Sequence, residues 1–261
     1  MLLRKAFADG TRRALRAVGF RAVTRTIRGV PIRIPVDMGK LEPLLFDSSY
    51  CPFFNEDEVL DALVARIRPG DAVFDIGAHH GVWAMLLAPH VTEVVAFEPQ
   101  PRTFDVLQEM IAVNGARNVS AACLALGSEP QTADFWGTGS GASLRPGALR
   151  PSHTRVTVDT LDRFVEHRGS APDVLKIDVE GAEYHVLLGG RQCLARARLV
   201  CIEVHFDELP KFGASYEMVL TLLIDAGFVQ IMRSTPTRLG ADDSSRAHVI
   251  FEKASELRQA N

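Results

Sequence analysis

The sequence predicts a doubly wound, Rossmann-like α/β fold whose mostly parallel sheet of seven strands ends in an antiparallel hairpin. Short apolar runs alternate with helical patterns between residues 56 and 226, which is typical of parallel strands joined by crossover helices. Glycine-containing turns, DIG at 75–77 and DVEG at 178–181, follow two of these runs. The last two strand-like runs, 228–233 and 248–252, have the turn-forming GADDS at 240–244 between them, which predicts the hairpin.

The individual elements follow from the apolar runs and from the residues that end them. A helix is expected at 56–67, with Asn55 as its cap and the Pro69–Gly70 turn after it. In the common doubly wound order, the strands at 73–76, 174–177 and 199–204 are neighbours. The full set of expected sheet strands is 73–76, 94–97, 119–126, 174–177, 199–204, 228–233 and 248–252, with helices from residue 82 and at 101–114, 182–188 and 216–226.

Residues 137–151 interrupt this pattern because they are rich in glycine and proline. Short strands are expected on either side of them, at 132–136 and 155–158. Both a lid over the active site and an ordinary surface loop fit this composition.

The N-terminal segment, 1–55, differs from the α/β domain expected at 56–261. Residues 1–28 hold eight Lys or Arg and one acid, Asp9, and their apolar residues fall near one helical face as far as Ala22. We expect a basic amphipathic helix that packs on the domain, with peripheral contact to an anionic membrane as the alternative. Residues 30–36 contain two prolines and are expected to be an extended edge segment.

Composition excludes several classes of protein. The chain has 261 residues, 47% of them hydrophobic and 23% charged, as expected of a soluble globular protein. The net charge of −3 argues against general nucleic-acid binding. The four cysteines form no CxxC pair and are expected to be buried, reduced thiols. We therefore expect a cytoplasmic location, since no apolar run has the length of a membrane-spanning helix or the form of a signal peptide. The sequence does not indicate an oligomeric state.

The turn at Val73–Gly81, VFDIGAHHG, predicts a cofactor site. Gly77 and Gly81 permit positive φ angles and let a ligand approach the backbone. Glu98 follows the next strand, where a carboxylate can accept both hydroxyls of a ribose. Asp75 would repel a pyrophosphate, and the glycine spacing departs from GxGxxG, so a nicotinamide dinucleotide is the weaker alternative. S-adenosylmethionine carries an ammonium and a sulfonium, which both favour a nearby carboxylate.

A second turn, KIDVEGAE at 176–183, predicts an acidic cluster beside the first. Asp178 and Glu180 follow the strand at 174–177, while Glu203 and His205 lie at the end of the strand at 199–204. Because these strands are expected to be neighbours of 73–76, the side chains should gather near the cofactor turn. Buried carboxylates this close need balancing charge, and Lys176, on the same strand face as Asp178, is expected to form an ion pair with an acid.

Several motifs resemble those of the FkbM-type S-adenosylmethionine-dependent methyltransferase family over about residues 71–252. This resemblance implies a class I methyltransferase fold and, usually, O-methylation of a sugar, a glycolipid or another hydroxyl-bearing metabolite. It also implies that Asp75, Gly77, Gly81 and Glu98 contact the cofactor. The motifs are DIGAHHG (75–81), AFEP (96–99), TLD (160–162), LKIDVEGAE (175–183) and IEVH (202–205).

Further cofactor contacts are expected from Ala78, His79, Leu126 and Asp178. The family usually has Asn at the position of His79, and a histidine there can still donate a hydrogen bond to the methionine carboxylate. The side chains of His79 and His80 are expected to diverge, so that one at most faces the cofactor. Leu126 lies where the third strand should end, at a place where an adenine ring could pack.

The expected reaction is an in-line methyl transfer to a hydroxyl oxygen of a small molecule or glycan. His205 is the first choice as general base, because an imidazole titrates near neutral pH. Asp178 and Glu203 are expected to orient it, contact the acceptor or hold a divalent metal such as Mg²⁺, although a metal is not favoured. The alternatives are N-methylation, metal-assisted O-methylation, a NAD-dependent oxidoreductase and a non-catalytic binding module. The fold does not encode the acceptor.

Overall fold

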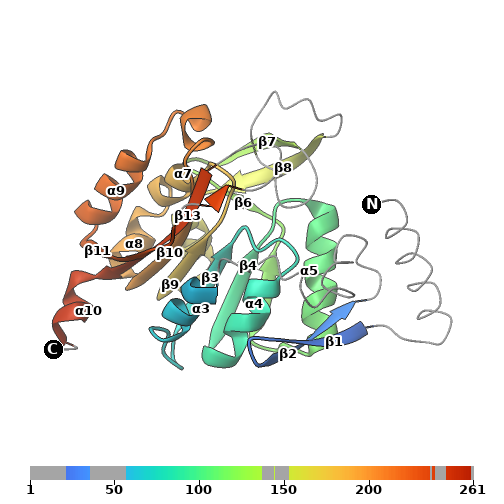
Figure 1. Cartoon of the computed structure of the whole chain (residues 1–261). Helices are drawn as coiled ribbons and strands as arrows, with labels where there is room; N and C mark the ends of the chain where they lie inside the picture. Colours follow the sequence, from blue (N-terminus) through green and yellow to red (C-terminus); the bar gives the residue numbers. More distant parts are fainter. Residues whose placement is uncertain are drawn as a thin grey trace.

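The central sheet has the predicted architecture (Figure 1). The computed structural model describes residues 22–35, 57–136, 144, 153–235, 237–238 and 245–259. The strands lie in the order β5–β4–β3–β9–β10–β13–β11, and only β13 runs antiparallel to its neighbours. Their bounds are β3 (Ala72–Ile76), β4 (Glu93–Phe97), β5 (Val119–Ala122), β9 (Val174–Ile177), β10 (Leu199–His205), β11 (Phe228–Arg233) and β13 (Ser245–Lys253), with the short β12 (Thr237–Arg238) paired to β13.

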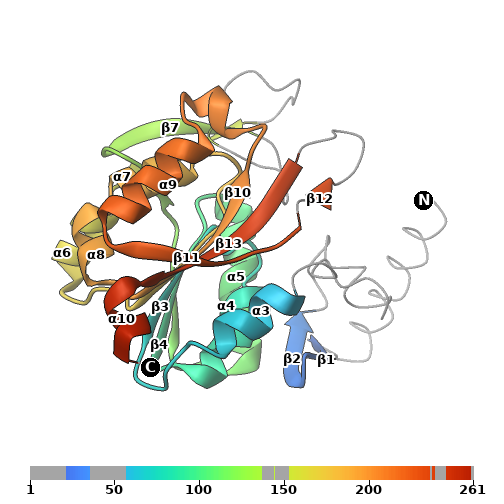
Figure 2. The same ribbon diagram turned by 60° about the vertical axis from the view of Figure 1, so that its left-hand side comes forward.

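Helices cover both faces of this sheet (Figure 2). On one face, α3, α4 and α5 share a hydrophobic cluster that includes Leu63, Leu87 and Leu107. On the other face, α6, α7, α8 and α9 share a second cluster that includes Leu187 and Leu223. The helices are α3 (Asp57–Val64), α4 (Val82–Leu87), α5 (Pro101–Asn114), α6 (Leu161–Arg168), α7 (Glu183–Leu188), α8 (Arg191–Arg196), α9 (Tyr216–Asp225) and α10 (Ala254–Gln259), with 3-10 turns η1 (Ala88–His90) and η2 (Leu209–Phe212).

Strand β10 lies inside the sheet, so that both of its faces are covered. All of its residues are buried, including the polar Glu203 and His205 at its carboxyl end. A strand between two helical layers normally carries apolar side chains on both faces. Two buried ionisable groups there therefore require partners, which the neighbouring turns supply.

The expected N-terminal helix is wrong for residues 22–28. β1 (Ala22–Ile27) and β2 (Val30–Pro35) pair as an antiparallel hairpin, and the extended segment expected at 30–36 is thereby confirmed as a strand. Arg28 and Gly29 both have positive φ, as a two-residue hairpin turn requires. The β-branched residues of β1 favour a strand, which outweighs the helical spacing of the apolar residues. Residues 1–21 lie outside the described part of the chain.

The third predicted strand, 119–126, is also wrong, because it is two strands in two sheets. The chain turns after β5, where the Leu124 N–H donates to the Ala122 carbonyl oxygen at 3.0 Å. β6 (Ala125–Leu126) then pairs with β8 (His153–Asp159), which also pairs with β7 (Gln131–Trp136). Cys123 in the turn is exposed, contrary to the expected buried thiol, whereas Cys193 and Cys201 are buried as expected.

Several other predicted elements have different bounds in the structure. The first helix is shorter than predicted, and α6, α8 and α10 were not predicted as helices. The Asn55 cap, the turn at 240–244 and, apart from Leu144, the segment 137–151 lie outside the described residues. β11 and β13 pair antiparallel, as the predicted hairpin requires. Among the helices that the structure describes, none combines the length and apolar character needed to cross a membrane. The domain boundary at residue 55 stays a prediction.

Candidate active site

The turn after β3 requires glycine at two positions. Gly77 has φ of 85°, and a Cβ there would lie 1.8 Å from the Asp178 carbonyl oxygen. Gly81 has φ of 83°, and a Cβ there would lie 2.4 Å from Leu107 Cδ1. The N–H groups of Gly77 and Ala78 both donate to the Phe97 carbonyl oxygen, at 3.0 and 2.9 Å. The turn is therefore held against β4 on one side and against the Asp178 turn on the other.

Glu98 lies directly beside this turn. Its Oε2 accepts the His79 N–H at 3.1 Å, and its Oε1 accepts the Gln100 N–H at 2.8 Å. Burial raises the pKa of Glu98 to about 7, although the hydrogen bonds from Gln100 and His79 oppose this rise. Each carboxylate oxygen has a further lone pair, so the group can accept two hydroxyls of a ribose.

His79 and His80 do not diverge as expected. Their ring centroids lie 3.7 Å apart with an interplanar angle of 47°. His79 has φ of 51°, in the left-handed region, which changes the direction of its side chain relative to the next residue. The two imidazole rings therefore lie against each other at the turn.

Leu126 is buried, with 3% of its surface exposed, and belongs to the second hydrophobic cluster. Because β6 leaves the central sheet, Leu126 does not end the third sheet strand. A contact between Leu126 and an adenine ring stays a prediction.

Lys176 joins the two turns electrostatically, as predicted. Its ammonium nitrogen lies 3.4 Å from Asp75 Oδ1 and 3.4 Å from Asp178 Oδ2. Burial raises the pKa of Asp75 above its ordinary value, and the charge of Lys176 opposes that shift. Burial would also raise the pKa of Asp178, but the charges of Lys176 and His205 outweigh it and hold that pKa below its usual range.

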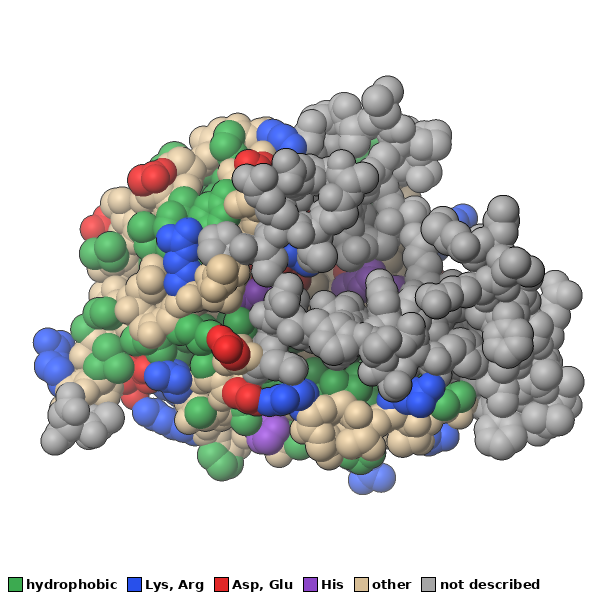
Figure 3. Space-filling model, viewed as in Figure 1, with side chains coloured by type: hydrophobic (Ala, Val, Ile, Leu, Met, Phe, Trp, Pro, Cys, Tyr) green, Lys and Arg blue, Asp and Glu red, His purple; other side chains and the backbone are tan. Residues whose placement is uncertain are grey.

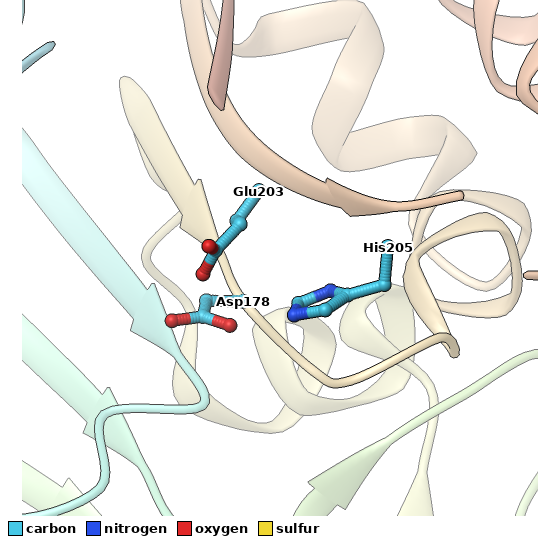
Figure 4. Close-up of side chains that lie close together, drawn as sticks. All are labelled: Asp178, Glu203 and His205. Carbon is cyan, nitrogen blue, oxygen red and sulfur yellow. The ribbon is translucent and has the colours of Figure 1, made fainter. Parts of the chain in front are cut away.

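Asp178, Glu203 and His205 come together as the strand order predicts (Figure 4). One oxygen or nitrogen atom from each lies within 4.8 Å of the others. The carboxylate of Glu203 and the imidazole of His205 both point toward Asp178 (Figure 4). Figure 3 shows histidine side chains near the middle of this face of the molecule, with acidic side chains beside them.

His205 is surrounded by carboxylates. Its Nδ1 lies 2.7 Å from Glu183 Oε1, and its Nε2 lies 3.4 Å from Glu180 Oε2. Burial alone would lower the pKa of His205, but the hydrogen bond and charge of Glu183 and the charges of Glu180 and Asp178 raise it to about 10. The premise for His205 as a general base, that its imidazole titrates near neutral pH, does not hold in this structure.

Two glutamates of the second turn complete this cluster: Glu180 lies in it as predicted, whereas the sequence did not indicate the role of Glu183. Glu183 is fully buried, and besides His205 it accepts the Gly181 N–H at 2.9 Å. Glu180 has φ of 55°, and burial raises its pKa to about 7, with His205 opposing and Asp178 adding to the rise. Both residues belong to the KIDVEGAE motif, but the sequence does not show which side chains they contact.

Strand β13 supplies two basic residues opposite the end of β10. In the antiparallel register, His248 pairs with Glu203 and Arg246 pairs with His205. Arg246 Nε lies 3.0 Å from Glu203 Oε1, and His248 Nε2 lies 4.0 Å from Glu203 Oε2. Burial lowers the pKa of His248 to about 4, so its imidazole is neutral at pH 7. The last predicted strand, 248–252, includes His248. The observed register of β10 and β13 shows that His248 and Arg246 lie opposite Glu203 and His205.

Comparisons with known proteins agree with this geometry. Residues 75–229 match the family described as the methyltransferase FkbM domain. The hexuronic acid methyltransferase AglP of Haloferax volcanii is 29% identical over 167 residues, which cover 60% of this chain and 65% of AglP. The 31-O-demethyl-FK506 methyltransferase FkbM of Streptomyces tacrolimicus is 31% identical over 218 residues, covering 68% of this chain and 80% of that protein. The chain thus spans slightly less than two thirds of AglP.

Two solved structures are similar to this chain at low sequence identity. Trm5b from Pyrococcus abyssi is 13% identical, with a TM-score of 0.50 over 90% of this chain and 56% of that chain. A methyltransferase FkbM from Methylobacillus flagellatus is 16% identical, with a TM-score of 0.47 over 71% of this chain and 44% of that chain. The sheet order and the family match together show that the chain is a class I methyltransferase of the FkbM family.

Proposed function

We propose that the protein transfers a methyl group from S-adenosylmethionine to a hydroxyl oxygen of a sugar or of another hydroxyl-bearing small molecule. The observation that carries this proposal is the position of Glu98 against the Gly77–Gly81 turn, in a chain of the FkbM methyltransferase family. S-adenosylmethionine supplies the activated methyl group. The residues of the chain must bind this cofactor, bind the acceptor and align the two.

The residues of the first turn fit this cofactor. Gly77 lets the turn lie directly against the Asp178 backbone, and Glu98 offers two oxygens for the ribose hydroxyls. Ala78, His79 and Gly81 form the turn that would hold the methionine part. Asp75 is fully buried and paired with Lys176, so it contributes negative charge beneath the turn. Asp178 lies between this turn and the residues that we propose to bind the acceptor.

The nature of the acceptor is supported by the relatives. The name of the Streptomyces protein specifies methylation of an oxygen of FK506, and AglP methylates a hexuronic acid. Both compounds are rich in oxygen, which favours O-methylation over N-methylation. Membership of a methyltransferase family argues against a NAD-dependent oxidoreductase. A cytoplasmic location, the absence of nucleic-acid binding and membrane contact through residues 1–28 stay predictions.

The chain's contribution to the rate is chiefly alignment. Holding donor and acceptor in line can supply about 7–11 kcal/mol, whereas a general base usually contributes about 10²- to 10⁴-fold. We place the acceptor hydroxyl at Asp178, Glu203 and His205, because these groups lie next to the cofactor turn and can accept hydrogen bonds or position a proton. The raised pKa of His205 makes it a poor candidate for sole base.

A methylation assay tests this proposal. The full-length protein is incubated with S-adenosylmethionine and, in turn, with hexuronic acids, neutral hexosides and a macrolide that has free hydroxyls. S-adenosylhomocysteine and an O-methylated product are expected together, and Glu98→Gln should reduce turnover at low cofactor concentration by at least ~10-fold.

Glu93→Gln is the matched control, because Glu93 lies at the other end of β4 and pairs with Arg168. It should behave as the unsubstituted protein. A product methylated only at nitrogen would contradict the proposed acceptor, and a folded protein that fails to bind S-adenosylmethionine would contradict the proposed cofactor.

A further inference from the structure

The three side chains Asp178, Glu203 and His205 converge from the ends of two adjacent parallel strands. Ile177 of β9 is in register with Ile202 of β10, so Asp178 and Glu203 are the next residues along each strand. One atom of each of the three residues lies within 4.8 Å of the others (Figure 4). This arrangement brings two oxygen atoms and one nitrogen atom toward a common point.

His205 presents a buried nitrogen to that point. The residue is 2% exposed, and its Nε2 makes no hydrogen bond to any residue that the structure describes. Its other nitrogen, Nδ1, lies 2.7 Å from Glu183, which is itself held by the Gly181 N–H. A metal-bound histidine almost always gives its second N–H to a carboxylate in this way, which fixes the tautomer and the orientation of the ring.

The two carboxylates are oriented in a corresponding way. Lys176 contacts Oδ2 of Asp178 at 3.4 Å, and Arg246 contacts Oε1 of Glu203 at 3.0 Å. His248 Nε2 lies 4.0 Å from the other oxygen of Glu203. Asp178 and Glu203 also approach each other within hydrogen-bonding reach, so a proton or a cation must separate their charges.

The surrounding charge is strongly negative. The acids outnumber the basic side chains that contact them in the described part of the chain: Asp75, Asp178, Glu180, Glu183 and Glu203 against Lys176, Arg246 and His205. The excess of acidic side chains creates a negative field, which attracts a divalent cation. A divalent cation would offset most of the excess charge.

We propose that Asp178, Glu203 and His205 bind one divalent cation of the Mn²⁺ type beside the cofactor turn. Carboxylates suit Mg²⁺, Ca²⁺ and Mn²⁺, whereas imidazole suits the later first-row metals, and Mn²⁺ accepts both kinds of ligand. Three protein ligands leave coordination positions open for acceptor oxygens.

The function of this cation rests on the proposed methyl transfer, whereas its binding does not. Coordination lowers the pKa of an acceptor hydroxyl, which removes the need for a neutral histidine base. The hydroxyl proton goes to water, and the oxygen forms the new bond to the methyl carbon. The electron pair of the broken carbon–sulfur bond stays on sulfur.

Titration with Mn²⁺ alone tests the site. Chelator-treated full-length protein is titrated while electron paramagnetic resonance follows the free ion. One Mn²⁺ per chain is expected to bind. Asp178→Asn, Glu203→Gln and His205→Gln should each weaken binding at least ~10-fold, whereas the Glu93→Gln control should not. Absence of binding at millimolar Mn²⁺, or binding that survives all three substitutions, would overturn the site.

Thermal unfolding keeps this test independent of misfolding. In metal-free buffer Asp178→Asn and Glu203→Gln should each still unfold in one cooperative transition, although at a lower temperature than the unsubstituted protein, because each breaks an ion pair with Lys176 or Arg246. Mn²⁺ should raise the unfolding temperature of the unsubstituted protein and not of these variants. An equal rise in all of them would contradict the assignment.

Titration with S-adenosylmethionine separates this inference from the proposed function. If metal-free protein binds the cofactor and methylates an acceptor at full rate in the presence of chelator, the cation has no role in catalysis and the proposed function stands. If the protein binds Mn²⁺ but not S-adenosylmethionine, the site stands and the proposed function fails.

Discussion

The backbone of Asp178 occupies the space next to Gly77 so closely that a Cβ on Gly77 would lie 1.8 Å from the Asp178 carbonyl oxygen. The cofactor turn and the acidic turn are therefore in direct backbone contact. Lys176 reinforces this contact through ion pairs to Asp75 and Asp178. Donor binding and acceptor binding are therefore expected to depend on the same few atoms.

Replacement of Gly77 by Ala should abolish cofactor binding. The substitution combines a left-handed φ with a backbone clash, and we expect it to lower the free energy of unfolding by roughly 2–4 kcal/mol. Urea denaturation and calorimetric titration with S-adenosylmethionine measure the two effects. Gly115→Ala is the matched control, because Gly115 has φ of 61° and nothing within 4 Å of its Cβ position. Equal effects of both substitutions would show that the Asp178 contact is unimportant.

Replacement of Lys176 by Met should strongly destabilise the protein at neutral pH. It leaves the buried carboxyl of Asp75 and that of Asp178 without their shared cation, which typically costs about 3–5 kcal/mol. The double variant Lys176→Met, Asp75→Asn should recover part of this loss, since one buried charge is removed with its partner. Urea denaturation of the single and double variants measures the difference. A single variant as stable as the unsubstituted protein would contradict the structural role of the ion pairs.

Cofactor affinity should rise with pH because of Glu98. Its pKa is about 7, and the ionised form is the better acceptor of ribose hydroxyls. If only that form binds, affinity should increase about tenfold between pH 6 and pH 8. Calorimetric titrations with S-adenosylmethionine across this range measure the effect. Glu98→Gln should bind weakly and with little pH dependence; a pH profile like that of the unsubstituted protein would assign the titration to another group.

The same group affects stability in the opposite direction. Because the folded state raises the pKa of Glu98 from 4.5 to about 7, it binds this proton more tightly than the unfolded state does. The stability that this proton contributes is complete below pH 4.5 and is lost as pH rises through 7, a loss of about 3 kcal/mol. Urea denaturation of the unsubstituted protein should show this loss, and Glu98→Gln should lack it.

Replacement of Glu183 by Gln should reduce turnover without reducing cofactor affinity. Glu183 contacts Nδ1 of His205 and the Gly181 N–H, and neither contact involves the Gly77–Gly81 turn. Glu183 is therefore a positioning residue. We expect the rate to fall by about 10- to 100-fold while the dissociation constant of S-adenosylmethionine is unchanged. Glu166→Gln on exposed α6 serves as the control. A matched loss of cofactor affinity would indicate a general structural effect instead.

The sequence predicted the parts of the fold that local patterns determine. Each glycine or acid of the two turns lies within a few residues of the strand that precedes it, so the local sequence identifies Gly77, Gly81 and Glu98. The strand order then brings Asp178, Glu203 and His205 together. The break between β5 and β6 was missed because it depends on pairing with β8, about thirty residues later. The Glu183–His205 bond joins residues 22 apart, and the contact of His79 with His80 depends on one positive φ.

Calorimetric titration with S-adenosylmethionine, repeated on Glu98→Gln and Glu93→Gln, decides whether the Gly77–Gly81 turn and Glu98 bind this cofactor. One molecule per chain is expected to bind, with an affinity weakened at least ~10-fold by Glu98→Gln and unchanged by Glu93→Gln. Absence of binding by the folded protein, or equal binding by both variants, would contradict this cofactor site.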